Sequence, residues 1–227
     1  MTRTAPSACL GKHRSGRRAL LSGTAVALAL LAAGCGRKRG AVGTALPAGT
    51  TVLALGDSIT AGTGAAAAAA YPAQLAALTG WHVVNGGVPG DTAAQALERL
   101  PDLLAEHKPA LVILSIGGND LLRRLPADAT EAAIRRSVAL AREGGAQVLL
   151  VGVPQPSLLA AAGAALSDHP MYERIAADLK LPLHGGGWAT VLGDAALKSD
   201  QIHPNAAGYR AFAEALAAGL RGHGLLN

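Results

Sequence analysis

Short, mostly apolar runs alternate along this chain with longer segments in which apolar residues recur every three or four positions. Runs of four to six such residues are typical of strands that are buried on both faces of a parallel sheet. The longer segments have the periodicity of amphipathic helices. Five strands are predicted, at Val52–Leu55, His82–Asn85, Leu111–Ser115, Gln147–Val151 and Leu181–His184.

Helices are predicted between these strands and after the last of them. The alternation of strands and helices predicts an α/β fold, a three-layer α/β/α sandwich that is doubly wound around a mostly parallel five-stranded sheet. Its crossover connections are expected to be right-handed. The five predicted helices are Tyr71–Thr79, Thr92–Glu106, Thr130–Glu143, Met171–Asp178 and Ala206–Leu220.

Particular residues mark where these elements begin and end. Thr92 is expected to cap the second helix and Thr130 the third, because threonine accepts hydrogen bonds from first-turn N–H groups. The glycine pair at 144–145 is expected to end the third helix. The alanine run Ala65–Ala70 is expected to be helical, because alanine has the highest helix propensity. Pro154–His169 fits no element and is interpreted as a loop bordering a site.

The first 34 residues are expected to be a signal peptide rather than part of the fold. Five Lys and Arg residues, with no acidic residue, precede an apolar run from Ala19 to Ala33. The run is short for a membrane span and ends in small residues followed by Cys35. The segment resembles a bacterial lipoprotein signal, which implies export and a lipid anchor on Cys35, facing the periplasm or the cell exterior. An ordinary secretory signal is the alternative, and Sec and twin-arginine export both remain open.

Removing residues 1–34 leaves 193 residues (227 − 34), which suits a single domain. Residues 35–50 are rich in Gly, Ala and basic side chains and are expected to form a flexible tether, with the domain at 51–227. The net charge of +5 comes from the signal, since 15 Lys and Arg (20 − 5) then face 15 Asp and Glu. No basic stripe remains and aromatic residues are 3%, so nucleic-acid binding is excluded.

Four polar motifs stand at the ends of predicted strands or before the last helix. Gly56–Ser58 (G-D-S) follows the first strand, Asn85–Thr92 the second and Gly117–Asp120 (G-G-N-D) the third, while Asp200 and His203 (D-Q-I-H-P) precede the last helix. In a parallel sheet the first three motifs converge on one edge, where ligands bind. If the C-terminal loop reaches the same edge, a serine, a histidine, an aspartate and an amide meet there.

These four motifs, in this order, resemble those of the SGNH hydrolases, also called the GDSL lipase/esterase family. The chain is most similar to the branch of small bacterial periplasmic esterases, thioesterases and lysophospholipases, over about Val52–Leu220. The resemblance implies a flavodoxin-like SGNH fold. It also implies a monomeric serine hydrolase that acts on small acyl-ester or lipid substrates with no cofactor and no metal.

The resemblance assigns a role to each motif. Ser58 is the nucleophile, His203 the base that activates it, and Asp200 the carboxylate that orients the imidazole. Backbone N–H groups of Ser58 and Gly90 and the side-chain amide of Asn119 form the oxyanion hole. Gly90 is preferred to Gly87 as the backbone donor because it directly precedes the Asp91-Thr92 pair, as in the family's motif.

Other functions stay open beside the expected hydrolysis of aryl esters, short- and medium-chain acyl esters, acyl thioesters and lysophospholipids. A carbohydrate O-acetylesterase uses the same fold and residues, and a non-catalytic ligand-binding lipoprotein is a third hypothesis. A dinucleotide site at Gly62–Ala67 is disfavoured, since no acidic residue ends the second strand. Arg123 and Arg124 are interpreted as a solvated helix end, with contact to an anionic head group as the alternative.

Overall fold

The computed structural model describes residues 43–156 and 165–227 of this chain. Cys35 and the expected signal peptide lie outside the described residues, as does the centre of the expected loop Pro154–His169. None of the described helices is long and apolar enough to span a membrane.

Five parallel strands form one sheet, in the order β2-β1-β3-β4-β5. All four neighbouring pairs are parallel, and β1 lies between β2 and β3. The predicted three-layer α/β sandwich is therefore confirmed, and so are all five strands, the last of them shorter than expected. Their bounds are β1 (Thr51–Gly56), β2 (His82–Gly87), β3 (Leu111–Ser115), β4 (Gln147–Val151) and β5 (Leu183–His184).

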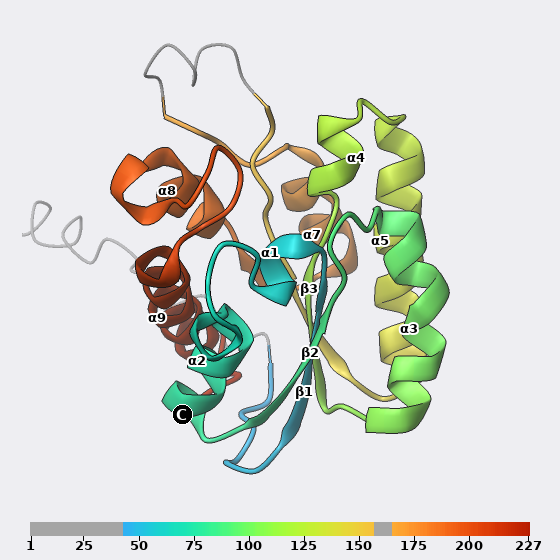
Figure 1. Cartoon of the computed structure of the whole chain (residues 1–227). Helices are drawn as coiled ribbons and strands as arrows, with labels where there is room; N and C mark the ends of the chain where they lie inside the picture. Colours follow the sequence, from blue (N-terminus) through green and yellow to red (C-terminus); the bar gives the residue numbers. More distant parts are fainter. Residues whose placement is uncertain (1–42, 157–164) are drawn as a thin grey trace, which may run out of the picture. The chain divides into compact units, whose positions relative to one another are not determined.

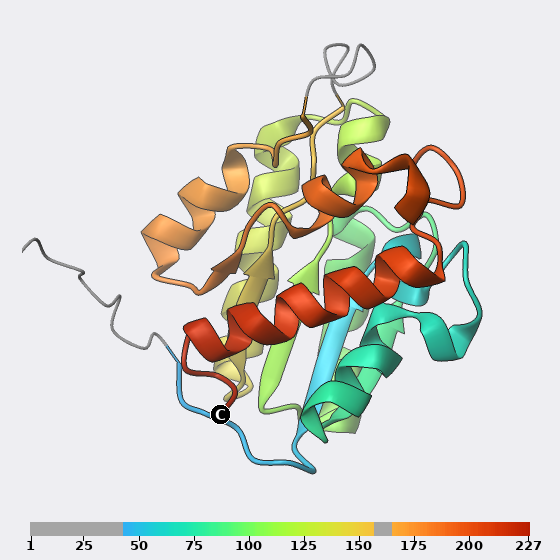
Figure 2. The same ribbon diagram turned by 90° about the vertical axis from the view of Figure 1, so that its left-hand side faces the viewer.

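Helices cover both faces of the sheet (Figures 1 and 2). The helices α3 (Ala93–His107), α5 (Ala127–Glu143) and α7 (Met171–Leu179) pack on one face, and α2 (Tyr71–Thr79), α8 (Gly187–Gly193) and α9 (Ala206–Gly222) pack on the other. Shorter helices stand at the carboxyl edge of the strands or in connections. They are α1 (Ser58–Ala61), α4 (Gly118–Leu122) and the 3-10 turns η1 (Ala67–Ala69) and η2 (Ala195–Leu197).

Successive residues of each strand pack into two different hydrophobic cores, one on each face of the sheet. Leu53 and Leu55 of β1 face α3, whereas Val52 and Ala54 face the aromatic core under α9. This alternation follows from the two-residue period of a strand and explains why the strands are apolar at every position. In the second core the rings of Trp188, Phe212, Tyr71 and Tyr209 stack on or meet edge to face with one another.

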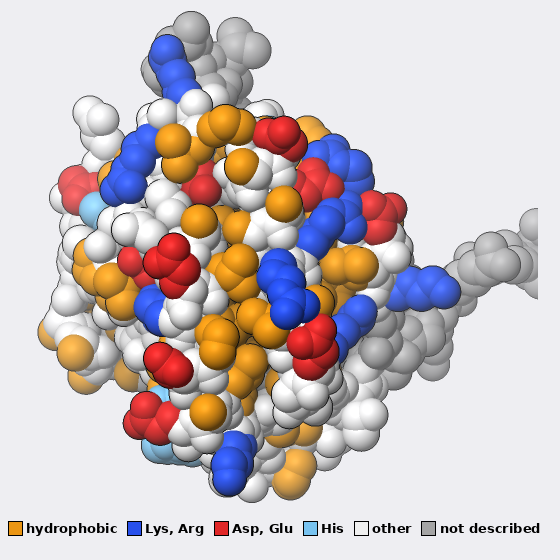
Figure 3. Space-filling view, turned by 90° about the vertical axis from the view of Figure 1, so that its right-hand side faces the viewer, with side chains coloured by type: hydrophobic (Ala, Val, Ile, Leu, Met, Phe, Trp, Pro, Cys, Tyr) orange, Lys and Arg blue, Asp and Glu red, His pale blue; other side chains and the backbone are white. Residues whose placement is uncertain are grey.

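The outer surface of the α3 and α5 layer faces solvent. Positive and negative side chains are interspersed on this side of the molecule (Figure 3). Glu131 of α5 accepts hydrogen bonds from Arg135 on the same helix and from Arg174 on α7, and Arg135 also pairs with Asp178. These ion pairs join two neighbouring helices, although exposed pairs contribute little to stability individually.

Two expectations about helices are wrong. The run Ala65–Ala70 forms only the 3-10 turn η1, because six residues cannot sustain an isolated helix and Ala70 is already the extended residue before α2. Thr130 does not cap α5, which begins at Ala127 after Pro126. Thr130 is instead the fourth residue of α5, and its hydroxyl donates to Asp120 Oδ1 at 3.1 Å. The expected cap at Thr92 is confirmed, as part of a capping box.

The described end of the expected tether belongs to the folded domain. The backbone N–H of Leu46 donates to the carbonyl of Leu225 at 3.0 Å, and the indole of Trp81 donates to the carbonyl of Leu46 at 3.3 Å. The side chain of Leu46 also packs against the core. Residues 43–50 therefore lie along the domain beside its C-terminus rather than in a tether.

Candidate active site

Ser58 stands at the carboxyl end of β1, as the first residue of α1. Asp57 caps this helix by accepting a hydrogen bond from the N–H of Ile59 at 3.1 Å. The turn is tight: a Cβ on Gly56 would lie 2.4 Å from the carbonyl oxygen of Ser115 on β3, so only glycine fits. The sequence thus ends a buried strand in a glycine and places a serine hydroxyl at the edge of the sheet.

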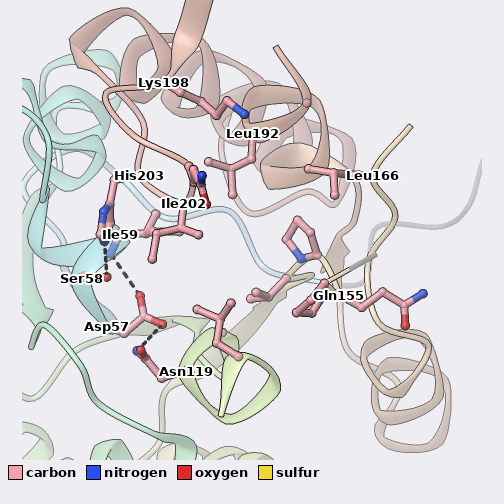
Figure 4. A pocket seen from close by; sticks show the side chains of 17 residues that line it. Asp57, Ser58, Ile59, Asn119, Gln155, Leu166, Leu192, Lys198, Ile202 and His203 are labelled. Atoms are coloured by element: carbon pink, nitrogen blue, oxygen red, sulfur yellow. Dashed lines mark hydrogen bonds between the residues drawn. The ribbon is translucent and has the colours of Figure 1, made fainter. Parts of the chain in front are cut away.

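His203 lies against this serine, although 145 residues separate the two in the chain. Its Nε2 is 3.0 Å from Ser58 Oγ, and its Nδ1 is 2.7 Å from Asp200 Oδ2 (Figure 4). A carboxylate only accepts hydrogen bonds, so the proton of the neutral ring belongs on Nδ1 and the Nε2 lone pair faces the serine hydroxyl. This is the arrangement in which an imidazole can take a proton from a serine.

The side chain of Asp200 is half exposed but firmly oriented. Its Oδ1 accepts hydrogen bonds from the backbone N–H groups of Ile202 and His203, both at 2.8 Å. The hydrogen bond from the His203 ring, followed by these backbone N–H groups, lowers the pKa of Asp200 to about 2. Asp200 is therefore a carboxylate at neutral pH.

Local hydrogen bonds hold the loop that carries His203. Lys198 and Pro204 form an isolated bridge across its base, and the Ser199 N–H donates to the His203 carbonyl at 3.0 Å. Asn205 caps α9 and donates its side-chain amide to the carbonyl of Ala196 at 2.8 Å. The long helix α9 thus anchors the short loop in front of the sheet.

Asn119 enters the site from the first turn of α4, which follows the end of β3. Its Nδ2 donates to the carbonyl of Asp91 at 3.0 Å and lies 3.5 Å from Asp57 Oδ2. Gly90 has a φ of +88°, and its carbonyl accepts a hydrogen bond from Arg123 at 2.9 Å. Asn119 of α4 and Arg123, the residue that ends this helix, therefore both hold the loop after β2 through hydrogen bonds.

The structure brings four of the five predicted site residues into direct contact with the cavity or with each other. Ser58, Asn119 and His203 line one cavity, and Asp200 reaches it through His203. Gly90 is held beside Asn119 through the neighbouring carbonyl but is not part of the described cavity wall.

Arg99 is a supporting residue that sequence reasoning missed. From the middle of α3 its Nε donates to Asp91 Oδ2 at 2.7 Å, and its Nη2 donates to the carbonyl of Gly56 at 2.9 Å. It therefore joins the loop that carries Gly90 to the turn that carries Ser58. An arginine on a helix eight residues after its partner has no local motif, so no sequence signal singles it out.

Asp57 is nearly inaccessible to solvent, with 6% of its surface exposed. Burial raises its pKa to about 6, and the nearby carboxylates of Asp120 and Asp91 act in the same direction. The N–H of Ile59 and the charge of His203 oppose this rise. The side chain is thus a buried helix cap beside the serine.

A cavity of about 580 Å³ opens in front of Ser58 and His203. Its described wall includes Pro154 and Leu166 from the two ends of the loop around 157–164, which itself lies outside the described residues. Arg123 is engaged with the carbonyl of Gly90 and is not a free helix end. The apolar side chains of the wall are those of Ile59, Leu122, Val153, Pro154, Pro156, Leu166, Leu192 and Ile202.

A family model described as the GDSL-like Lipase/Acylhydrolase family matches residues 54–211. The chain belongs to this family. The matched range contains Ser58, Gly90, Asn119, Asp200 and His203.

Two curated relatives of this hydrolase carry related names. It is 38% identical over 144 residues to "Esterase TesA" of Pseudomonas aeruginosa, covering 61% of this chain and 66% of the relative. It is 34% identical over 165 residues to "Thioesterase 1/protease 1/lysophospholipase L1" of Escherichia coli K12, covering 70% and 77%. A solved structure named "Crystal Structure of TesA" superposes with a TM-score of 0.67 at 34% identity, covering 76% of this chain and 98% of that one. These relatives place the chain among the hydrolases of ester bonds.

Proposed function

We propose that this protein is a serine esterase that hydrolyses carboxylic esters through an acyl-Ser58 intermediate. The observation that carries the proposal is the unbroken chain of hydrogen bonds from Ser58 Oγ through His203 to Asp200 at the mouth of an apolar cavity. Its expected substrates are aryl esters, short- and medium-chain acyl esters, acyl thioesters and lysophospholipids. The names of the relatives, an esterase and a thioesterase/lysophospholipase, agree with this range.

Acylation begins when Ser58 Oγ attacks the ester carbonyl carbon and His203 Nε2 accepts the hydroxyl proton. Asp200 stabilises the imidazolium that forms. The tetrahedral intermediate then loses its alcohol: the bond between carbon and alcohol oxygen breaks, and His203 returns the proton to that oxygen. Water, activated by the same histidine, then hydrolyses the acyl-serine and releases the carboxylic acid.

Three hydrogen-bond donors are proposed to stabilise the negative charge of the tetrahedral oxygen. The N–H of Ser58 lies in the first turn of α1, where N–H groups have no partner within the helix. Asn119 Nδ2 carries two protons: one donates to the carbonyl of Asp91 at 3.0 Å, and the other makes only a long hydrogen bond of 3.5 Å to Asp57 Oδ2, which the oxyanion is proposed to replace. The N–H of Gly90 is the third donor, on the loop that Asn119 and Arg123 hold in place.

The wall of the cavity bears on the choice between ester classes. Leucine, isoleucine, valine and proline side chains suit an acyl chain, because burying its methylene groups against them is favourable. A carbohydrate O-acetylesterase with the same catalytic residues is the second candidate, since Gln155 and Gln201 on the same wall offer the polar partners that a sugar needs. A non-catalytic binding protein has no support in the intact Ser58, His203 and Asp200 geometry.

We infer separately that the protein is exported and anchored to a membrane through lipidated Cys35. The support is the composition of the first 35 residues: a basic start, an apolar run and small residues before the cysteine. This inference is independent of the ester chemistry, and it has a test of its own below.

Turnover of p-nitrophenyl butyrate by the purified domain tests the proposed chemistry. Ser58→Ala should lower kcat roughly 10⁴- to 10⁶-fold, as loss of the nucleophile does in comparable enzymes. Ser137→Ala is the matched control, because Ser137 lies in α5 and donates only to the carbonyl of Ala133. Retained activity in Ser58→Ala would overturn the proposal.

A further inference from the structure

Lys198 lies on the wall of the cavity, two residues before Asp200 and five before His203. Its side chain is partly buried and lines the same cavity as Ser58 (Figure 4). Its backbone is fixed, because Asn205 Nδ2 donates to the Lys198 carbonyl at 3.2 Å and the residue is bridged to Pro204. The backbone that carries this ammonium group is therefore held in place beside the cavity.

The charge of this lysine has no counterion in the part of the chain that the structure describes. The other charged or titratable groups on the wall have partners: Asp57 caps α1, and His203 bonds Ser58 and Asp200. Figure 4 shows the Lys198 amine on the side of the cavity where Leu192 lies. A cation held against apolar surface interacts strongly with any anion that enters, since the local dielectric constant is low.

The chemistry of the proposed reaction determines which part of an ester meets Lys198. His203 must return its proton to the alcohol oxygen, so that oxygen has to come within hydrogen-bond reach of Nε2. The alcohol part therefore lies along the loop of residues 198–203. The acyl part is then left to the rest of the wall, which includes Leu122 of α4 and Val153 after β4.

We propose that Lys198 is a specificity-determining residue that binds an anionic group on the alcohol part of the substrate. The fitting ligand is a phosphate ester of glycerol, as in a lysophospholipid whose acyl chain occupies the apolar wall. Lysine is a common point-charge partner for phosphate. This inference rests on the proposed ester hydrolysis and adds the class of leaving group that the site prefers.

Two substrates with the same octanoyl chain, used below their micellar concentrations, test the proposal. One is octanoyl-lysophosphatidylglycerol, which carries a phosphodiester, and the other is monooctanoylglycerol, which is neutral. Lys198→Gln should lower kcat/KM for the phosphodiester roughly tenfold, equivalent to about 1.4 kcal/mol, and leave kcat/KM for the neutral ester unchanged. Lys198→Arg should retain most of the preference, because it keeps the charge.

Lys108→Gln is the matched control, since it removes the same charge at the end of α3, before β3 and thus at the opposite edge of the sheet. It should affect neither substrate. Equal losses on both substrates in Lys198→Gln, or no loss on either, would overturn the proposal. So would Lys198-dependent inhibition of neutral-ester hydrolysis by inorganic phosphate alone, which would indicate a site for a free anion. Failure of the ester chemistry itself would show separately, as inactivity of the unmodified protein on p-nitrophenyl butyrate.

Discussion

Two residues beside Ser58 prepare the site in different ways. Asp57 is buried and caps the first turn of α1. The side-chain amide of Asn119 lines the cavity and also donates a hydrogen bond to the loop after β2. Both are polar groups at the end of an apolar strand, and both neighbour the reacting atoms without exchanging protons with the substrate. Their substitution should therefore separate transition-state stabilisation from support of the fold.

Asn119→Ala should lower kcat for p-nitrophenyl butyrate roughly 10²- to 10³-fold, because an oxyanion donor acts mainly in the transition state. KM should change little, and the thermal unfolding temperature should show that the fold survives. Full activity in a folded Asn119→Ala protein would remove this residue from the oxyanion hole.

Asp57→Asn should stabilise the protein at neutral pH but not in acid. The folded protein raises the pKa of Asp57 from 3.8 to about 6, so it binds this proton more tightly than the unfolded chain does. The resulting stabilisation is complete below about pH 4 and is lost as the pH rises through about 6. Asparagine keeps the capping oxygen without the buried charge, so the variant should gain up to about 3 kcal/mol over this range.

Urea denaturation at closely spaced pH values between 4 and 8 measures that gain. The difference in unfolding free energy between the variant and the unmodified protein should grow from pH 4 to pH 6 and then level off. A difference that is constant, or that shrinks as the pH rises, contradicts the role assigned to burial.

Connections between elements explain why loops at this edge hold their shape. Arg99 ties α3 to the end of β1 and to the loop after β2, and Asp120 of α4 accepts a hydrogen bond from the N–H of Ala93 at the start of α3. The side chains of Arg99 and Asp91 are 25% and 10% exposed. Such a partly buried pair leaves a costly unpaired carboxylate when one member is removed.

Arg99→Met should lower the unfolding free energy by about 1–3 kcal/mol and should also reduce kcat, because the loop that carries Gly90 loses one of its anchors. Arg136→Met is the control: Arg136 pairs with Glu143 on the surface of α5, and both side chains are more than half exposed. Its loss should cost less than about 1 kcal/mol. Urea denaturation of both variants measures the two losses of unfolding free energy. Equal losses would refute the supporting role of Arg99.

Elements whose own residues carry a clear sequence signal were predictable. Elements that are held by contacts with residues far away in the sequence were not. The bounds of β3 and β4 match their apolar runs, and α2 has the predicted bounds Tyr71–Thr79. Helix α8 was missed, because its seven residues include two glycines and its main support is Trp188 stacked on Phe212 of α9. The partners of Arg99 were equally hidden, since they depend on how α3 docks.

At the scale of the whole molecule, strand order determines the position of the site. Placing β1 between β2 and β3 brings the ends of three strands together, and with them Ser58, the loop of Gly90 and Asn119. The convergence of these three was predictable from a parallel sheet. The return of His203 across 145 residues was expected only from the resemblance to a family, because no local pattern shows where α9 docks.

The proposed export and membrane anchor concern the whole chain. Cys35→Ser in the full chain, expressed in a bacterium that processes lipoproteins, should move the protein from the membrane pellet to the soluble fraction, because Cys35 is the proposed site of the lipid. Esterase activity per molecule should not change. A variant that still sediments with membranes would contradict lipid anchoring at this residue.

Covalent labelling with a fluorophosphonate probe tests the central claim most directly. Such a probe reacts with a serine only where a neighbouring base activates it, and peptide mass spectrometry locates the adduct. We predict one adduct, on Ser58, in the native protein and in Ser137→Ala, and none in Ser58→Ala or after denaturation. An adduct on another residue, or labelling that persists without Ser58, would contradict the assignment of Ser58, His203 and Asp200 as the catalytic machinery.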